Sequence, residues 1–422
     1  MQTKTDLRSG TVAFDRRQVY RPFLERLNPI ASLRDLADRD VIVPRDHDPC
    51  DAGQAPIHVA FADAAELSRG TQMALVGGIG SGKTTELLLT QKVLSRHSDA
   101  VNIFVDLANY TDLNELNTGA ILATVGMRLY SLLKKRDKKP PEEVTSAHTR
   151  LRELALGKTT WVPAEQWLDY DNDEEPEAIR VNVPGLMRLR FPALRREVKE
   201  LKELLLNIAS PLLDNDAQIT LLIDGLDRLI RPERFREYAD QDLQALRGTK
   251  LTIIVAVPLL LWYDPSRFLQ DYFDLVKHIP AAAAGPGDLA FLKQILERRG
   301  ALELMDRAEV TSIARCSGGV LRDLLTLARS AAAYAYRDDQ DRIGRKHVLA
   351  AIKQLGNRYL AGLGTTKRLR LRRLAASNEF SIQDPTAQEL LVNRQVLEYF
   401  DRGREFFAVH PALAKVLPKP PA

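Results

Sequence analysis

A glycine-rich segment is the part of the sequence whose residue types and spacing point most directly to chemistry. It reads Gly77-Gly78-Ile79-Gly80-Ser81-Gly82-Lys83-Thr84 and matches G-x-x-x-x-G-K-[ST] at every fixed position. An apolar run, Met73–Val76, precedes it, and a segment that can open a helix follows from Thr85. In such a loop the backbone N–H groups and the helix N-terminus face phosphate oxygens. We therefore expect residues 77–85 to bind a nucleoside triphosphate, ATP with Mg²⁺.

Lys83 and Thr84 have separate expected roles in this loop. The ammonium group of Lys83 neutralises charge on the β- and γ-phosphates, and the hydroxyl of Thr84 is a ligand for Mg²⁺. A chance glycine turn before a helix is the alternative. The strand that precedes the loop and the helix that follows it favour the nucleotide site.

Two aspartates at the end of another apolar run complete the expected site. The run Thr220-Leu221-Leu222-Ile223 continues into Asp224-Gly225-Leu226-Asp227. The carboxyl ends of parallel strands lie at the ligand-binding edge of an α/β sheet, so we expect Asp224 to hold Mg²⁺ directly or through water. Asp227 is expected to polarise the water that attacks the γ-phosphate. A turn former or a helix cap is the alternative role for Asp227.

Apolar runs that alternate with helical periodicity indicate the scaffold that must position these residues. The alternation predicts a doubly wound parallel sheet. After residue 285 the periodicity predicts a small helical bundle, followed by a helix near Thr386–Phe400 and a β-like segment, Phe406–Val409. A short β-like run is also present at Val41–Val43. The expected strands of the sheet are Met73–Val76, Val101–Val105, Ile219–Ile223, Leu251–Val257 and Leu275–Ile279.

The length and composition are those of an ordinary globular protein. Its 422 residues exceed the size of one hydrophobic core, so more than one domain is expected. The net charge of +4 comes from 60 basic and 56 acidic side chains, so any nucleic-acid affinity must be local. No apolar run has the length or position of a signal peptide or a membrane span, and we expect a cytoplasmic protein with no membrane partner. Cys50 and Cys316 lack the spacing of zinc or disulfide sites.

Over roughly Ile57–Leu355 the chain resembles the AAA+ and STAND branch of P-loop ATPases. The resemblance rests on the glycine loop, the strand that ends at Asp224, and the segment Cys316-Ser317-Gly318-Gly319-Val320-Leu321-Arg322-Asp323. The spacing between Asp224 and Asp227 is similar to that of STAND and NACHT proteins. The Gly-Gly-x-x-Arg segment is instead similar to the lid of origin-recognition and transposon-type AAA+ ATPases.

The resemblance implies an α/β fold with a parallel-sheet P-loop NTPase core, a helical lid and a small C-terminal winged-helix-like domain. We expect an N-terminal arm before the core and a helical insertion within it. The expected ranges are 1–56 for the arm, 57–285 for the P-loop ATPase core with its insertion at 134–215, 286–362 for the helical lid and 363–422 for the winged-helix-like domain.

The resemblance also implies roles for residues outside the glycine loop. Arg322 matches the sensor 2 arginine, which would reach the γ-phosphate and act in catalysis beside Lys83 and Asp227. A surface arginine paired with an acidic side chain is the alternative. The strand Leu251–Val257 runs into Pro258 without the polar residue of sensor 1, so slow turnover is expected.

Three further residues have weaker expected roles. Asn109, just past the strand that begins at Val101, would be a switch residue that contacts the catalytic carboxylate, with a turn former as the alternative. An arginine finger between subunits of a homo-oligomer would come from Arg247 or Arg267. A solvated surface cation is the alternative for both arginines.

A basic run opens the expected C-terminal domain. It reads Lys367-Arg368-Leu369-Arg370-Leu371-Arg372-Arg373, and such a cluster can contact DNA phosphates. The alternation of leucine with arginine also fits a linker with one packed face. The winged-helix domains of one related group touch DNA, whereas those of the other keep the nucleotide domain closed.

Three functions follow from these observations. The first is a slow ATPase switch that regulates a separate effector or partner protein, which by resemblance would suit antiviral defence in bacteria. The second is a DNA-binding AAA+ ATPase of the origin-recognition or transposition-regulator type. The third, a module that keeps nucleotide as a structural ligand, stays open because the polar residue of sensor 1 is missing.

Overall fold

The chain folds into two compact units. The computed structural model describes eleven segments of the sequence. The sheet unit comprises Asp46–Pro280, and the helical unit comprises Met1–Arg45 together with Ala281–Ala422. The described segments are 15–28, 41–96, 100–107, 118–136, 139–163, 178–184, 195–213, 217–229, 232–282, 286–401 and 403–417.

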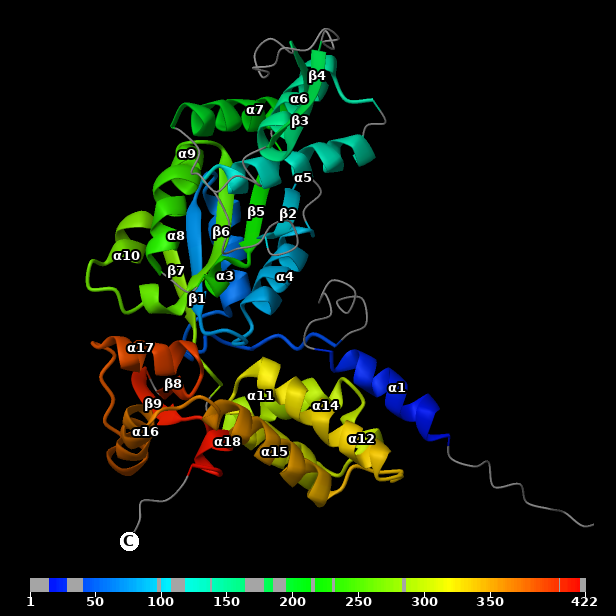
Figure 1. Ribbon diagram of the computed structural model, residues 1–422, viewed down its shortest axis with the longest axis vertical. Helices are drawn as coiled ribbons and strands as arrows, with labels where there is room; N and C mark the ends of the chain where they lie inside the picture. Colours follow the sequence, from blue (N-terminus) through cyan, green and yellow to red (C-terminus); the bar gives the residue numbers. More distant parts are fainter. Residues whose placement is uncertain are drawn as a thin grey trace, which may run out of the picture. The chain divides into compact units, whose positions relative to one another are not determined.

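A five-stranded parallel sheet forms the centre of the sheet unit (Figure 1). The strand order is β2-β5-β6-β1-β7, so one strand, β6, separates the strand before the glycine loop from the strand that ends at Asp224. β1 and β6 are buried along their whole length, as expected for parallel strands that are covered on both faces. The five predicted strands are thereby confirmed. They are β1 (Gln72–Gly77), β2 (Ala100–Asp106), β5 (Gln218–Asp224), β6 (Leu251–Pro258) and β7 (Leu275–Ile279).

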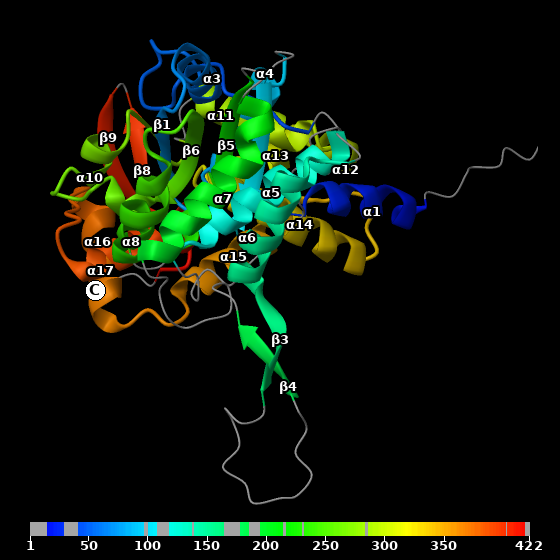
Figure 2. The ribbon, with the colours of Figure 1, turned by 90° about the horizontal axis from the view of Figure 1, so that it is seen from above.

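Helices flank this sheet, and a helical insertion with a β-hairpin lies between β2 and β5. Figure 2 shows the antiparallel β3–β4 hairpin extending away from the helices of the insertion. The insertion holds α5 (Ala120–Arg136), α6 (Glu142–Leu156), β3 (Gly157–Pro163), β4 (Ala178–Pro184) and α7 (Arg195–Leu213). The other helical elements of the unit are α3 (Ile57–Leu67), α4 (Lys83–Leu94), η5 (Leu226–Arg228), α8 (Pro232–Tyr238), η6 (Ala239–Leu243), α9 (Gln244–Leu246), η7 (Leu259–Leu261) and α10 (Phe268–Tyr272).

A buried aspartate holds the start of the insertion against the core. The two carboxylate oxygens of Asp242, in the π-helical turn η6, accept hydrogen bonds from the backbone N–H groups of Gly119 at 2.6 Å and Ile121 at 3.0 Å. These N–H groups belong to the unpaired donors of a helix N-terminus. Burial raises the pKa of Asp242 to about 7, against the opposing effect of these hydrogen bonds. These hydrogen bonds fix the first turn of α5 to η6.

The helical unit is built around one hydrophobic cluster. This cluster includes Phe23 of α1, Leu324 of α14, Leu371 of α16 and Leu413 of α18, so the bundle helices and the C-terminal elements share a core. The elements are α1 (Arg16–Arg26), α11 (Pro286–Glu297), α12 (Ala301–Leu304), α13 (Arg307–Cys316), α14 (Leu321–Arg337), α15 (Arg345–Leu360), α16 (Thr365–Ser377), α17 (Pro385–Val392), β8 (Val396–Asp401), β9 (Arg404–Val409) and α18 (Pro411–Ala414).

Two sequence-based expectations differ from the structure. The expected helix Thr386–Phe400 is wrong in its second half, because α17 ends at Val392 and the chain turns before the strand β8. Arg394 in that turn has a φ of 61°, which a continuing helix does not allow. The β-like run Val41–Val43 forms no strand, since it has no partner strand in the part of the chain that the structure describes.

The C-terminal helices and the β8–β9 hairpin form the small winged-helix-like part of the α/β fold. The boundary expected between a lid and this part, at residues 362 and 363, stays a prediction, as do the other expected domain boundaries. Asn109 lies outside the described residues. No helix in the described segments is both long enough and apolar enough to span a membrane.

Candidate functional site

The glycine loop connects the buried strand β1 to the first turn of α4. Gly82, at the N-cap of α4, has a φ of 114°, a left-handed conformation that a side chain would strain. A Cβ at Gly77 would lie 2.7 Å from the carbonyl oxygen of Ile279, so only glycine fits between β1 and β7. No side chain of the described residues caps α4. The first N–H groups of this helix are therefore available to an anion.

Lys83 is buried and turns back on the loop that precedes it. Its ammonium group donates hydrogen bonds to the carbonyl oxygens of Gly77 at 2.6 Å and Gly78 at 2.7 Å. It also forms an ion pair with Asp227 at 2.9 Å. The side chain of Lys83 is only 3% exposed and that of Asp227 only 9% exposed. Two residues that the sequence predicts for one site therefore meet directly.

Thr84 and Asp224 form the second contact of the site. The Thr84 hydroxyl donates a 2.6 Å hydrogen bond to Oδ2 of Asp224, and the backbone N–H of Gly225 donates to Oδ1 at 2.8 Å. Asp224 is the last residue of β5, and Asp227 follows in the 3₁₀ turn η5. The structure thus brings together Lys83, Thr84, Asp224 and Asp227 at one edge of the sheet.

Burial of Asp224 has an electrostatic cost. Burial, and then the neighbouring carboxylates of Asp227 and Asp106, raise the pKa of Asp224 to about 6, while Thr84 and Gly225 lower it. Because the folded pKa lies above the unfolded value of about 3.9, the stability that this group contributes is complete below about pH 4. It is lost as the pH rises through about 6. At neutral pH the ionised Asp224 carboxylate therefore opposes folding, and a bound divalent cation would offset this effect.

Asp106 is a carboxylate of this edge that the sequence analysis missed. It is the last residue of β2 and pairs in register with Asp224 of β5. Its place directly after the apolar run Val101–Val105 is the signal that could have identified it.

The oxygen atoms at this edge fit a hard divalent cation and a phosphate chain. The Thr84 hydroxyl and the Asp224 carboxylate would hold Mg²⁺, which prefers oxygen ligands and usually adds substrate phosphates to one or two carboxylates. Oδ1 of Asp227 and Oγ of Ser81 are buried and have no hydrogen-bond partner among the described residues. Buried polar atoms of this kind usually have a partner, such as a ligand, an ion or a water molecule.

Other predicted loop residues line the same turn. Gly78, Ile79, Gly80, Thr84 and Thr85 are half-buried, so the loop keeps a partly exposed side.

The position expected for sensor 1 is apolar. β6 ends at Pro258, and the next residue, Leu259, is 8% exposed. A Cβ at Gly78 would lie 3.8 Å from Cδ2 of Leu259, which places this leucine beside the glycine loop.

The expected role of Arg247 or Arg267 as an arginine finger stays a prediction. Arg247 lies over the ring of Tyr272, and Arg267 is exposed at the N-cap of α10.

Arg322 belongs to the helical unit, on the first turn of α14. Its backbone carbonyl accepts a 2.7 Å hydrogen bond from the hydroxyl of Thr326. The sensor 2 role of Arg322 stays a prediction.

The basic run 367–373 lies within a helix, α16, and part of its charge is already neutralised. Lys367 pairs with Glu389, and Arg370 pairs with Asp384 at 2.5 Å. Arg373 is exposed. The packed face that the sequence suggested is present, since Leu371 and Leu374 are buried. Beside this helix lies a cavity of about 610 Å³, whose lining includes Thr366, Arg370, Arg373, Ser377, Phe380 and Ser381.

Comparisons with known proteins identify similar structures but no family. No family model matches the sequence, and no curated protein matches it. The solved ORC2 protein of Aeropyrum pernix is similar at 14% identity over 90% of this chain and 95% of that chain, with a TM-score of 0.44. The Drosophila ORC structure, solved bound to DNA, is similar at 16% identity over 99% and 95% of the two chains, with a TM-score of 0.42.

A branch-migration motor is also among the similar structures. The RuvB protein of Thermotoga maritima is similar at 14% identity over 86% of this chain and 93% of that chain, with a TM-score of 0.38. Because these three TM-scores lie below 0.5, we base the function of this chain on its own residues.

Proposed function

We propose that this protein binds ATP with Mg²⁺ at the glycine loop and hydrolyses it slowly. The observation that carries the proposal is the meeting of Lys83, Thr84, Asp224 and Asp227 at the carboxyl edge of the sheet. These residues come from the loop after β1 and from the end of β5, and the loop spacing matches the phosphate-binding motif. The resemblance to AAA+ and STAND ATPases supports the same assignment.

Each protein group has a definite task in this proposal. The loop N–H groups from Gly78 to Thr85 and the ammonium of Lys83 bind and orient the phosphates. Bound Mg²⁺ would supply charge neutralisation at the phosphates, held by Thr84 and Asp224. Phosphate binding would take Lys83 away from Asp227, because the ammonium cannot keep all its present partners while it contacts a phosphate. The Asp227 carboxylate would then be available as the base that accepts a proton from water.

Slow turnover is supported by the apolar surroundings of the loop. Leu259 occupies the place beside Gly78 where a polar side chain could orient the γ-phosphate or the attacking water. Removal of one such oriented donor costs catalysis about 10²-fold or more in enzymes that use it.

Release of phosphate from ATP tests the assignment. We expect the wild type to release phosphate slowly with Mg²⁺ and not at all with EDTA. The Asp224→Asn variant should release no phosphate with Mg²⁺ or with EDTA. The Asp224→Asn variant should stay folded, since its amide can keep the contacts to Thr84 and Gly225 while it removes a buried charge. Phosphate release by Asp224→Asn at the wild-type rate would refute the metal-binding role of Asp224.

We infer that DNA is the first partner to test for this ATPase. The supporting observation is the cavity beside α16, whose lining includes the exposed Arg373, the half-buried Arg370, three hydroxyl side chains and one carboxylate, that of Glu379. Cations and hydroxyls are the groups that contact DNA phosphates without reading sequence. The two ion pairs of the helix limit the number of phosphates it can neutralise. A separate effector protein that is regulated by the nucleotide state, as in defence systems, is the second candidate, and a homo-oligomer is proposed for either.

Duplex binding at several salt concentrations separates these two partners. If α16 contacts phosphates, we expect the affinity to fall as salt rises, and Arg373→Ala should reduce the logarithmic salt slope by about one. The matched control is Arg315→Ala, an exposed arginine of α13 in the same unit, which should leave the slope unchanged. Undetectable or salt-independent binding would reject DNA and leave the effector protein as the partner.

A further inference from the structure

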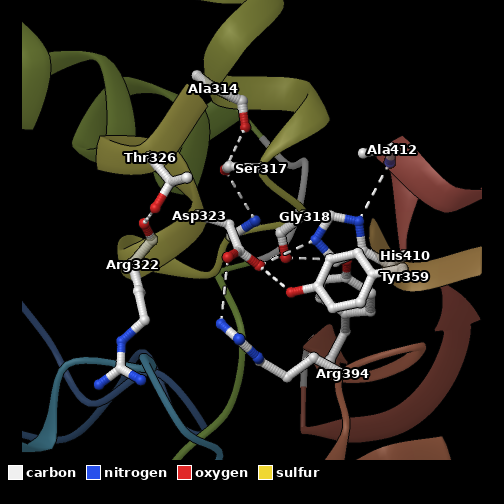
Figure 3. A network of polar contacts seen from close by, with 12 residues as sticks. Ala314, Ser317, Gly318, Arg322, Asp323, Thr326, Tyr359, Arg394, His410 and Ala412 are labelled. Atoms are coloured by element: carbon white, nitrogen blue, oxygen red, sulfur yellow. Dashed lines mark hydrogen bonds and ion pairs between the residues drawn. The ribbon is translucent and has the colours of Figure 1, made fainter. Parts of the chain in front are cut away.

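The side chain of Asp323 lies at the centre of a buried polar cluster in the helical unit (Figure 3). Asp323 is the third residue of α14 and is only 3% exposed. Its Oδ2 accepts a hydrogen bond from the Tyr359 hydroxyl at 2.5 Å, and its Oδ1 accepts one from Nη1 of Arg394 at 3.1 Å. Nε2 of His410 lies 3.3 Å from Oδ2. One carboxylate thus contacts three side chains.

The neighbours of Asp323 all present donor groups to it. His410 is fully buried, and its Nδ1 accepts a 3.1 Å hydrogen bond from the backbone N–H of Ala412. A neutral imidazole that accepts at Nδ1 carries its proton on Nε2, the atom that faces Asp323. Burial opposes the charge of Asp323, but His410, Arg394 and Tyr359 outweigh it and hold the pKa of this carboxyl below its usual range. The cluster therefore contains an ionised and well-partnered aspartate.

The three partners of Asp323 come from separate parts of the helical unit. Tyr359 is near the end of α15, and Arg394 is in the turn between α17 and β8. His410 lies between β9 and α18 and accepts the helix-capping hydrogen bond of α18. The guanidinium of Arg394 also lies over the Tyr359 ring, 5.7 Å from its centre. Asp323 is thus the point at which α14 is joined to the last elements of the chain.

The two glycines before α14 let these elements approach closely. Gly318 has a φ of 63°, and a Cβ there would lie 2.4 Å from Cδ1 of Leu397 in β8. Gly319 has a φ of 76°, and a Cβ there would lie 1.9 Å from the carbonyl oxygen of Ala282. The Tyr399 hydroxyl of β8 donates a 3.0 Å hydrogen bond to the carbonyl of Gly318. Gly318 is therefore required for packing of the hairpin against the start of α14, and Gly319 for the close approach of the backbone at Ala282.

Arg322 directly precedes Asp323, and Figure 3 shows the two side chains leaving α14 on different sides. We propose that Asp323 is a positioning residue that fixes the first turn of α14, and with it Arg322, to the C-terminal segment 390–413. The helix that carries Arg322 and the C-terminal hairpin then move as one body, so that a response of Arg322 to nucleotide is passed to the C-terminal elements. This coupling rests on the predicted sensor 2 role of Arg322, in which the guanidinium reaches the γ-phosphate that ATP has and ADP lacks.

A change at Asp323 should loosen both ends of this connection together. In Asp323→Asn one carboxylate oxygen is replaced by an N–H donor, which faces either Arg394 at the Oδ1 position or His410 and Tyr359 at the Oδ2 position. In either orientation a donor then faces a donor. The half-buried guanidinium of Arg394 and the buried imidazole of His410 lose the negative charge that they face. Arg394→Gln is the second variant, because its side chain is 21% exposed and its loss leaves the core packing intact.

The test combines amide hydrogen exchange with nucleotide affinity on the full chain. Without nucleotide, Asp323→Asn and Arg394→Gln should speed exchange by about tenfold or more both in residues 318–326 and in residues 390–413. With a fluorescent ATP analogue and fluorescent ADP, both variants should lose the preference for one nucleotide that the wild type shows. Arg322→Ala should lose the same preference without faster exchange.

A matched control separates this coupling from a general effect of losing an ion pair. Asp306→Asn removes the exposed pair of Asp306 with Arg342 in the same unit, and should change neither measurement. Two results would overturn the coupling. One is an exchange rate in residues 390–413 of Asp323→Asn that equals the wild-type rate. The other is faster exchange in Asp323→Asn together with an unchanged preference between ATP analogue and ADP. A wild-type chain without any nucleotide preference would instead reject the role of Arg322, and the exchange comparison alone would then decide the attachment.

Discussion

In Asp227→Asn we expect ATP hydrolysis to slow by at least about 10²-fold while ATP binding stays within a few fold of the wild type. The amide cannot accept the proton of the attacking water. Lys83 keeps its hydrogen bonds to Gly77 and Gly78, so the loop should hold its shape. Single-turnover phosphate release and titration of a fluorescent ATP analogue, measured on one preparation, give the two quantities.

The matched control for this variant is Asp63→Asn. Asp63 is an exposed aspartate of α3 in the same unit and should leave both quantities unchanged. Equal turnover in wild type and Asp227→Asn would mean that the base lies elsewhere, and Asp106 would be the next carboxylate to change. No turnover in either protein would leave nucleotide as a structural ligand.

Lys83→Ala should weaken ATP binding by at least about tenfold, which corresponds to about 1.4 kcal/mol. The backbone amides of the loop alone do not neutralise the charge of a triphosphate, and Lys83 supplies a charge-assisted hydrogen bond to it. In this variant no ammonium group stands near the phosphates to offset their repulsion from the buried carboxylate of Asp227. Equilibrium titration with the fluorescent analogue measures the loss.

Lys83→Gln separates the charge of the lysine from its structural contacts. The glutamine amide can still donate to the carbonyl oxygens of Gly77 and Gly78, so this variant should be the better folded of the two. We expect the same loss of affinity as in Lys83→Ala, because neither side chain is positive. Wild-type affinity in a folded Lys83→Gln protein would remove the assignment of the glycine loop as the phosphate site.

Local patterns in the sequence were sufficient for the five strands and for four residues that meet at the sheet edge, Lys83, Thr84, Asp224 and Asp227. The three central strands β1, β5 and β6 are short, mostly apolar runs, because they are buried along nearly their whole length. The edge strands β2 and β7 are only partly buried and include Asn102 and Lys277. The pattern of the glycine loop is also local, since the left-handed backbone at Gly82 disfavours other residues. The need for glycine at position 77 is different, because it comes from the approach of Ile279 in β7.

The sequence was a weaker guide where local preference and tertiary partner compete. The residues Val396–Asp401 continue the periodicity of a helix, yet they form β8 because β9 offers a paired edge. The basic run 367–373 had two interpretations, and only the positions of Glu389 and Asp384 decide which of its cations are neutralised. Periodicity describes one segment at a time and contains no information on which charged groups will meet.

Sequence patterns alone were thus enough to predict the α/β scaffold, the glycine loop, and the aspartates at positions 224 and 227. The folded structure was needed to learn that Lys83 pairs with Asp227, that Asp106 lies in register with Asp224, and that Asp323 joins α14 to the C-terminal elements. The physical reason is the range of the interactions involved. Runs of apolar residues and the backbone preferences of glycine are local properties of the chain, whereas ion pairs and hydrogen bonds between side chains depend on which distant segments the core packs together.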